Sequence, residues 1–335
     1  MIYISVLIYT YDRRDYVVKA VKSVLEQNMD RTMFEIIVVK GFIDDEMDNW
    51  LQKNGVKSVY LKEKSLGKKI AIGINESRGE IISFLDDDDE YAFSKLSTIS
   101  EIFNENPEVD FVHNSLIKID ENGSVIEPNP KENPRTPLSF LTNNEDYSLL
   151  SRIIRYRGDW YLSCMSIRKS VLLEVIDSLY SIDQSVDKFI FFTALDYGKG
   201  MIFLSDKLTR YRMHPSTTTY TGSEEDFVAR REVFFRNTVR VFGQIVKMSV
   251  NRPGNRLATC QLLQHKINLY FISDDGDSKV SMLEFIEFLG CLGITRSRYQ
   301  LIWIGAFLVR RISLRCSRRA YYKFFKISFK EAVKS

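Results

Sequence analysis

Cysteine is scarce in this chain of 335 residues, which has only four, and none of them are spaced as a metal or redox pair. The sequence therefore suggests no disulfide framework and favours a reducing compartment. The chain also lacks a run of about 18 apolar residues, which a membrane-spanning helix requires. The N-terminus, MIYISVLIYTYDRRDY, has neither the basic segment nor the cleavage site of a signal peptide, and it is typical of a first strand.

An excess of charge of one sign is also absent, because the formal net charge is only +3. The whole-chain charge therefore indicates no particular partner. Its distribution is uneven, since the segment from Ser223 to the end carries about ten more basic than acidic residues. Apolar residues make up 44% of the chain and aromatic residues 13%, which is enough for a real core and excludes a disordered chain.

Apolar strands alternate with helical patterns in the first third of the chain. Strands are expected over 2–9, 34–42, 56–63 and 80–85, and helices over 15–27, 45–54 and 68–79. Because most of these strands are apolar along nearly their whole length, they are expected to be buried on both faces. The pattern therefore predicts an α/β fold with a mostly parallel sheet flanked by helices.

The rest of the chain has a mixed pattern. A helix is expected over 89–106, a β-hairpin over 109–127, helices over 148–155, 168–179 and 187–197, and a strand over 201–214. From Glu224 onward the pattern is helical and basic. We therefore expect a domain with a sheet, followed by a helical, basic appendage.

Four consecutive aspartates, Asp86–Asp89, come directly after the expected strand 80–85. Ligands of open α/β sheets bind beyond the carboxyl ends of the strands, where these residues lie. Adjacent carboxylates repel one another, and a divalent cation removes that penalty. Oxygen ligands suit Mg²⁺ or Mn²⁺, which use one or two carboxylates plus substrate phosphates. The sequence predicts a metal–diphosphate site; the alternative, an acidic first turn of a helix, explains one or two aspartates but not four.

Four segments together resemble glycosyltransferase family 2: YTYDRRDYVVKAVKSVLEQ, FEIIVVKG, SRGEIISFLDDDDEYAFSKL and KLTRYRMHPST. The similarity covers about residues 2–220, and the order and spacing of the segments make it specific. It implies a Rossmann-like GT-A fold and a metal-dependent, inverting transfer from a nucleotide sugar. It also implies a catalytic domain over 1–220, with a nucleotide-binding half (1–110) and an acceptor half (111–220), before the helical region 221–335.

The resemblance assigns roles to the acidic cluster. It implies that Asp86 and Asp88 bind Mn²⁺ or Mg²⁺, that Asp86 also lies near the donor, and that Asp87 fills the variable position on the donor side. Asp89 would cap the following helix or support the site. His214, in YRMHP, would approach the metal or the donor diphosphate, with a purely structural histidine as the alternative.

The donor end departs from the family pattern. Thr10, Tyr11 and Arg13 match the residues that follow the first strand, whereas Lys40 stands where the family has an aspartate that helps to hold the base. Lys40 and Lys68 would instead contact the donor phosphates, with a solvated face as the alternative for Lys68. A UDP-sugar is the first expectation for the donor, and a GDP-sugar is the second.

A base must accept the proton of the acceptor hydroxyl. The resemblance implies Asp187, at the start of a helix, for this role, with Asp183 as the second candidate and an ordinary helix-start aspartate as the bland alternative. Trp160 is a candidate stacking platform for an acceptor sugar, although an ordinary buried tryptophan fits the pattern equally well.

Residues 299–330 place apolar and basic side chains on separate faces at helical spacing, with aromatics at the flanks. This pattern predicts an interfacial helix, or alternatively one that packs on the catalytic domain. We expect a peripheral protein on the cytoplasmic, inner face of the cell membrane that acts on a lipid-linked or glycan acceptor and binds no nucleic acid.

Two other functions stay open. One is a nucleotidyltransferase, although no Gly-rich loop lies near the N-terminus. The other is a non-catalytic nucleotide- or carbohydrate-binding subunit, which the departure from the family pattern at Lys40 favours.

Overall fold

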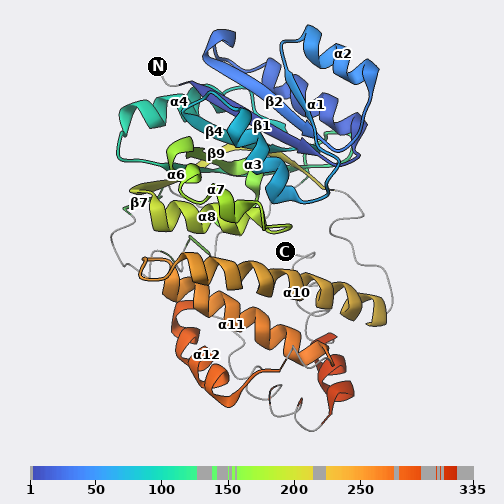
Figure 1. The fold of residues 1–335 in the computed structure, drawn as a ribbon, viewed down its shortest axis with the longest axis vertical. Helices are drawn as coiled ribbons and strands as arrows, with labels where there is room; N and C mark the ends of the chain where they lie inside the picture. The colour runs from blue at the N-terminus through green and yellow to red at the C-terminus, as the bar shows by residue number, and fades with distance from the viewer. Residues whose placement is uncertain are drawn as a thin grey trace. The chain divides into compact units, whose positions relative to one another are not determined.

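The computed structural model describes residues 3–126, 138–141, 150, 153–154, 157–213, 224–274, 279–295, 307, 310 and 313–322. The chain divides into two compact units, residues 1–218 and residues 219–335 (Figure 1). The first unit holds a β-sheet with helices on its faces, and the described part of the second unit is helical.

Nine strands form one sheet in the described part of the first unit. They are β1 (Ile4–Thr10), β2 (Phe34–Lys40), β3 (Lys57–Tyr60), β4 (Ile81–Asp86), β5 (Glu90–Tyr91), β6 (Phe111–Ile119), β7 (Leu138–Leu141), β8 (Met165–Arg168) and β9 (Gly200–Arg212). Their order is β3-β2-β1-β4-β8-β6-β9-β5, and β7 pairs with β9.

One half of the sheet is entirely parallel. Strands β3, β2, β1 and β4 run in the same direction, whereas β8 is antiparallel to both β4 and β6, and β6 and β9 are again parallel. The register places Tyr9, near the end of β1, beside Asp86, at the end of β4. The predicted α/β class is therefore confirmed, with a mixed sheet. The parallel half of this sheet places Asp86, an expected site residue, at its carboxyl edge.

Helices cover both faces of the sheet (Figure 1). The first unit contains α1 (Arg14–Leu25), α2 (Asp45–Lys53), α3 (Leu66–Glu76), α4 (Lys95–Glu105), α6 (Lys169–Leu173), α7 (Ile176–Leu179) and α8 (Val186–Tyr197). The apolar sides of α1, α2 and α4 join one buried cluster with the strands. On the other face Gly73 of α3 lies against Leu7 and Val39, where an added Cβ would come within 3.4 Å of these side chains. Burial of these faces is the main source of stability.

Three expected elements differ from the structure. The helix expected over 89–106 is wrong at its start, because Glu90 and Tyr91 pair with β9 as strand β5 and α4 begins only at Lys95. The expected hairpin turns at 120–124, but its second strand is reduced to one bridge between Ile119 and Val125 among the described residues. The region expected as one helix over 168–179 forms the two short helices α6 and α7. The helix expected over 148–155 lies mostly outside the described residues.

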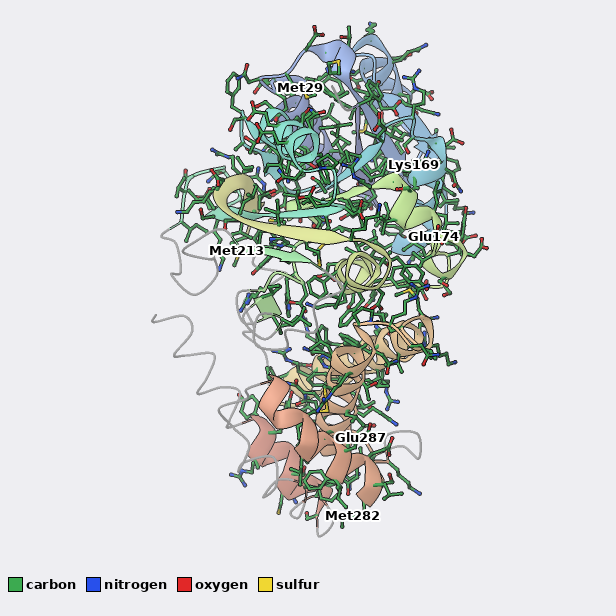
Figure 2. The ribbon with its side chains drawn as sticks, turned by 90° about the vertical axis from the view of Figure 1, so that its left-hand side faces the viewer. Met29, Lys169, Glu174, Met213, Met282 and Glu287 are labelled. Atoms are coloured by element: carbon green, nitrogen blue, oxygen red, sulfur yellow. A yellow bond between two sulfur atoms is a disulfide. The ribbon has the colours of Figure 1, made fainter. Side chains whose placement is uncertain are left out.

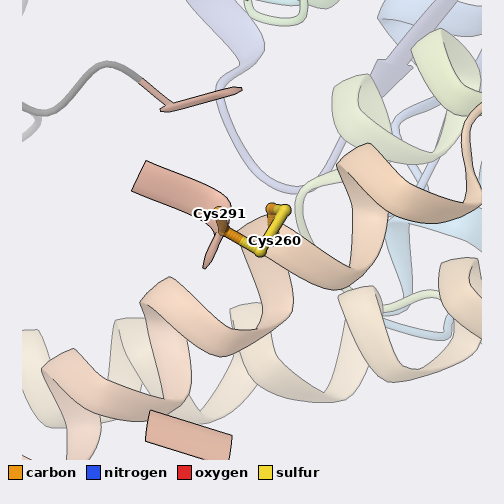
Figure 3. The surroundings of a disulfide bond; sticks show 2 residues. All are labelled: Cys260 and Cys291. Carbon is orange, nitrogen blue, oxygen red and sulfur yellow. A yellow bond between two sulfur atoms is a disulfide. The ribbon is translucent and has the colours of Figure 1, made fainter. Parts of the chain in front are cut away.

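The second unit contains α10 (Glu224–Met248), α11 (Asn255–Ile272) and α12 (Met282–Thr295). Cys260 of α11 and Cys291 of α12 form a disulfide, with 5.4 Å between their Cα atoms (Figure 3). The expectation of no disulfide is therefore wrong. The two cysteines are 31 residues apart in the sequence, and this spacing alone does not predict a disulfide. They come close enough to bond only because α11 and α12 pack side by side.

Within the described part of the chain, no helix combines the length and the apolarity that crossing a membrane requires. Of the interfacial helix expected over 299–330, residues 314–322 are described as helical, with Arg315 and Arg319 exposed and Tyr321 buried. The remaining residues of that prediction lie mainly outside the described ranges.

Candidate active site

The four aspartates, Asp86–Asp89, form an acidic turn that joins β4 to β5. The backbone N–H of Asp89 donates to the carbonyl oxygen of Asp86 (3.2 Å), and the N–H of Asp86 donates to Ser163 Oγ (2.9 Å). Ser163 lies in the 3₁₀ turn Leu162–Cys164, directly before β8. The turn that carries the aspartates is thus hydrogen-bonded to the segment around Trp160, which comes from the other half of the domain.

Asp89 is buried inside this turn and supports it. Its Oδ2 accepts a hydrogen bond from Ser163 Oγ (2.6 Å), and its Oδ1 accepts one from the backbone N–H of Arg212 (2.9 Å). Burial raises the pKa of Asp89 to about 8, the nearby Asp86 adds to the shift, and the two hydrogen bonds oppose it. The helix cap expected for Asp89 is not formed, since α4 starts after Ser94.

Arg212, at the end of β9, holds the backbone of the turn. Its side chain is 1% exposed, and its Nε donates to the carbonyl of Asp88 (2.8 Å). Nη1 donates to the carbonyls of Asp120 (2.9 Å) and Glu121 (3.1 Å), and Nη2 forms an ion pair with Glu90. One buried guanidinium therefore joins β9, the acidic turn and the 120–124 turn.

The carboxylates of the other three aspartates have separate partners. The hydroxyl of Tyr9 donates to Asp86 Oδ1, and Arg13 forms an ion pair with Asp88 and lies 3.4 Å from Asp87 Oδ1. The pKa of Asp86 is raised to about 6, first by burial and then by the charges of Asp87 and Asp187, while hydrogen bonds from Tyr9 and Ser163 oppose the shift. Negative charge on Asp86 is thus disfavoured by its surroundings, which is the condition that a bound cation relieves.

A pocket of about 340 Å³ joins residues from distant parts of the sequence. It is lined by Tyr9, Leu66, Asp86, Lys118, Arg157, Trp160, Tyr161, Leu162, Ser185, Val186, Asp187, Tyr211 and Met213. Figure 2 shows Met213 beyond the end of the long strand β9. Asp86, Trp160 and Asp187, which sequence reasoning selected from three separate segments, all line this one pocket.

Asp187 lies in the first turn of α8, where its Oδ1 accepts the backbone N–H of Lys188 (2.9 Å). Burial raises its pKa, whereas the charge of Lys188 and the hydrogen bond from that residue lower it. A raised pKa makes a carboxylate a better proton acceptor near neutral pH. The second candidate, Asp183, is exposed and does not line the pocket.

Trp160 is 40% exposed, so it is not an ordinary buried tryptophan. Its carbonyl is held by His113 Nε2 at 2.9 Å, and Lys188 Nζ lies 4.1 Å from the centroid of its ring. Lys188 also forms a buried ion pair with Asp159 at 2.7 Å. The lysine next to Asp187 thus orients the ring that forms one wall of the pocket.

Three pocket residues have a left-handed backbone. Arg157 (φ 57°), Tyr161 (φ 65°) and Ser185 (φ 53°) are three of the four non-glycine residues with positive φ in the described part of the chain. Each such residue costs about 1 kcal/mol or more, and this strain concentrates at functional sites. Sequence reasoning missed all three residues, because side-chain identity carries no signal for this backbone state.

The residues expected to bind the donor form two groups: three residues at and after the end of β1, and two lysines that pair with carboxylates elsewhere. Thr10 is buried, Tyr11 is 46% exposed with Lys64 Nζ 5.3 Å from its ring centroid, and Arg13 lies at the acidic turn. Lys40, however, is buried and donates to Phe42 O (2.8 Å) and Asp48 Oδ2 (2.9 Å), which directs it towards α2. Lys68 forms an ion pair with Glu63. Neither lysine lines the pocket.

The acidic turn fits a cation that shares its ligands with a substrate. In the described part of the chain, no group of three or more His, Cys, Asp or Glu side chains is arranged to enclose a metal ion. His214 lies outside the described residues. Asp86 and Asp88 therefore offer one or two carboxylates, the number that Mg²⁺ commonly takes from a protein when phosphates supply other ligands.

Comparison with solved structures supports the fold. The chain is similar to S. aureus TarS 1-349 in complex with UDP, with a TM-score of 0.57 and 16% identity over 99% of this chain and 91% of that one. It is equally similar to the same protein in complex with UDP-GlcNAc, with a TM-score of 0.57 and 18% identity. The mixed sheet, its flanking helices and the helices that follow thus define a GT-A-type glycosyltransferase fold.

Residues 5–158, somewhat less than half of the chain, match the family model of glycosyl transferase family 2, the family that the sequence resembles. Among curated proteins, an uncharacterized glycosyltransferase of Rickettsia bellii is 31% identical over 37% of this chain and 18% of its own length. An uncharacterized glycosyltransferase of Nostoc is 28% identical over 63% of this chain and 65% of its own length.

A third relative is GalNAc(5)-diNAcBac-PP-undecaprenol beta-1,3-glucosyltransferase of Campylobacter jejuni. It is 34% identical over 30% of this chain and 35% of its own length. The chain thus spans about a fifth of the length of the Rickettsia relatives that it matches and about a third of this one.

Proposed function

We propose that this protein transfers one sugar from a nucleotide-sugar donor to a hydroxyl or phosphate oxygen of an acceptor, with inversion at the anomeric carbon. One observation carries the proposal: a single pocket is lined by Asp86 from the acidic turn, Asp187 from the start of α8 and the half-exposed ring of Trp160. A donor bound at Asp86 and an acceptor bound at Trp160 would meet in front of Asp187.

The chain's own residues provide the steps of a single displacement. The acceptor oxygen forms a bond to the anomeric carbon while the bond from that carbon to the donor's phosphate oxygen breaks. Asp187 accepts the proton of the acceptor hydroxyl, and the nucleoside diphosphate departs with the bonding electrons. The raised pKa of Asp187 supports this role. Tyr9 and Ser163 orient Asp86, and Arg13 orients Asp88.

Asp86 and Asp88 would hold Mn²⁺ or Mg²⁺, which when bound neutralises charge on the departing diphosphate. Thr10, Tyr11 and Arg13 would contact the nucleotide, with Asp87 beside them. UDP-sugars are the first donors to test, because TarS 1-349 is described in complex with UDP and with UDP-GlcNAc; GDP-sugars are the second.

The acceptor that we propose is lipid-linked or a glycan, in glycan or glycolipid assembly. The name of the Campylobacter jejuni relative, which acts on a PP-undecaprenol acceptor, supports the lipid-linked class.

We also propose a peripheral location on the cytoplasmic face of the cell membrane. The exposed Arg315 and Arg319 of the second unit support this location. Because Cys260 and Cys291 form a disulfide, the cysteine content does not favour a reducing compartment.

The test is a screen for nucleotide binding and release. UDP with Mn²⁺ is expected to raise the melting temperature of the protein, and the matching UDP-sugar is expected to release UDP slowly without an acceptor. Asp88→Asn should remove most of the Mn²⁺-dependent part of the stabilisation and reduce release at least about 100-fold, because one carboxylate of the metal site is lost.

Asp206→Asn is the matched control, since Asp206 is an exposed aspartate of β9 that does not line the pocket, and it should behave like the wild type. Full release by Asp88→Asn would contradict the metal role. Nucleotide binding by the wild type without release from any UDP- or GDP-sugar would favour the second candidate, a non-catalytic binding subunit, which the burial of Lys40 at the expected base-binding position supports.

A further inference from the structure

Charged residues of both signs line the pocket. The acidic residues are Asp86, at the end of β4, and Asp187, at the start of α8. Two cations also line it: Lys118, near the end of β6, and Arg157, in the turn before Trp160. A transfer that used only neutral hydroxyl groups on the acceptor would require the carboxylates but would gain little from the two cations.

Arg157 is held in place by its surroundings. Its Nη1 donates to the hydroxyl of Tyr161 (2.8 Å), and its guanidinium carbon lies 5.3 Å from the centroid of the Trp160 ring. Its backbone has a φ of 57°, which a non-glycine residue adopts only at a cost. The chain tolerates this strain at the residue that brings the guanidinium to the pocket, which is typical of a functional rather than a solvating arginine.

Three aromatic rings pack against one another in the wall of the pocket. The ring centroids of Tyr161 and Tyr211 are 4.9 Å apart in an edge-to-face arrangement, and those of Trp160 and Tyr161 are 6.3 Å apart. All three side chains line the pocket. Such rings pack against the C–H face of a sugar or a polyol. The pocket thus offers an apolar wall for the body of an acceptor and cations for a group attached to it.

Both cations come from the part of the chain that follows the nucleotide-binding half of the proposed function. Lys118, Arg157 and the three aromatic residues all come from residues 111–213, whereas Thr10 ends β1 and Tyr11 and Arg13 follow it. An anionic acceptor would be repelled by Asp86 and Asp187 unless cations offset that repulsion. Guanidinium and ammonium groups are the side chains that bind phosphate, the arginine in a bidentate manner.

We propose that the acceptor carries a phosphate group close to the oxygen that receives the sugar, and that Lys118 and Arg157 bind this phosphate while the aromatic wall of Trp160, Tyr161 and Tyr211 packs against the acceptor. The inference rests on the proposed function, because it names the class of acceptor for the same site. The phosphate belongs either to a lipid headgroup or to a soluble phosphodiester chain, and the recognition chemistry is the same for both.

The first experiment measures binding without a divalent cation, so that a metal–diphosphate complex cannot form. Glucose 1-phosphate and methyl glucoside serve as a matched pair of probes, titrated by calorimetry in the presence of EDTA. Glucose 1-phosphate is expected to bind at least about tenfold more tightly. Lys118→Ala and Arg157→Ala should each remove most of that preference, whereas Lys207→Ala, which alters an exposed lysine of β9 outside the pocket, should leave it unchanged.

Equal binding of the two probes, or an equal preference in Lys118→Ala and Arg157→Ala, would overturn the proposal. It would also be overturned if the two variants weakened the binding of UDP as strongly as that of glucose 1-phosphate, because the cations would then serve the donor. These readouts require no turnover. If the protein prefers glucose 1-phosphate but releases no nucleotide from any donor, the proposed function is refuted and the phosphate-binding proposal is not.

The second experiment measures transfer with the donor found in the screen. The acceptors are a polyprenyl-diphosphate sugar in vesicles, a soluble glycerol-phosphate oligomer, and glycerol and a neutral alkyl glucoside as unphosphorylated partners. The ratio of kcat/KM for the phosphorylated over the neutral acceptor is expected to fall at least about tenfold in Arg157→Ala. Transfer to the vesicle lipid or to the oligomer supports the proposal and identifies the source of the phosphate. Transfer to the neutral acceptors alone would contradict it.

Discussion

Asp187→Asn is expected to lower the rate of sugar transfer by about 1,000-fold or more, because the amide cannot accept the proton of the acceptor hydroxyl. The substitution keeps the size of the side chain, and Asn Oδ1 can still accept the N–H of Lys188 that Asp187 accepts at 2.9 Å. Binding of the nucleotide donor should therefore remain within about twofold of the wild-type value. Transfer is measured by release of nucleoside diphosphate with saturating acceptor, and donor binding by calorimetry.

Asp183→Asn is the matched comparison, since Asp183 lies four residues earlier, is exposed and does not line the pocket. Its turnover should be close to that of the wild type. If Asp183→Asn loses turnover and Asp187→Asn keeps it, the proton goes to Asp183 and the role that we propose for Asp187 is wrong.

The rate of transfer should also depend on pH in a defined direction. Burial raises the pKa of Asp187 above its ordinary value of about 3.8, and only the deprotonated carboxylate accepts a proton. Activity should therefore be complete above the raised pKa and should be lost as the pH falls through it, at a pH higher than that of an exposed carboxylate. A profile of kcat/KM against pH that stays flat down to about pH 4 would contradict this expectation.

Arg212→Met is expected to lower the free energy of unfolding of the first unit by about 3–5 kcal/mol, because it leaves Glu90 without its buried partner and removes the donors to Asp88, Asp120 and Glu121. For a unit of this size the loss corresponds to a decrease of roughly 10 °C in melting temperature. Thermal unfolding followed by circular dichroism measures the effect.

Arg210→Met provides the matched control for that measurement. Arg210 pairs with the same Glu90 at 3.2 Å, but its side chain is 36% exposed, so its ion pair is screened by water and should contribute no more than about 1 kcal/mol. Equal melting temperatures for the two variants would show that the buried network around Arg212 does not stabilise the acidic turn.

The sequence predicted the parallel half of the fold well, because buried parallel strands are apolar along their whole length. Residues 2–9, 34–42 and 80–85 are nearly continuous apolar runs, and they form β1, β2 and β4. The prediction failed where tertiary pairing outweighed a local pattern. Residues 90–91 look like the start of a helix, but pairing with β9 makes them a strand.

The acidic residues of the site could be predicted from the sequence, because the expected chemistry requires carboxylates. Consecutive carboxylates after a buried strand pointed to Asp86, and the resemblance to glycosyltransferase family 2 pointed to Asp187. Both residues line the pocket. The lysines were less predictable, because a lysine pairs with whichever carboxylate lies nearby. Lys40 turns towards Asp48 of α2, and only the folded chain reveals this. Arg157, Tyr161 and Ser185 were missed because backbone conformation, not residue type, distinguishes them.

These three left-handed residues have a consequence for anyone who engineers the protein for heat resistance. Screens for thermostability would favour glycine or asparagine at Arg157, Tyr161 and Ser185, since either residue adopts a positive φ more easily. Such variants would survive heating better while losing the guanidinium, the phenol or the fixed loop that shapes the pocket. A stabilisation campaign should therefore keep these three positions unchanged and seek its gains elsewhere in the chain.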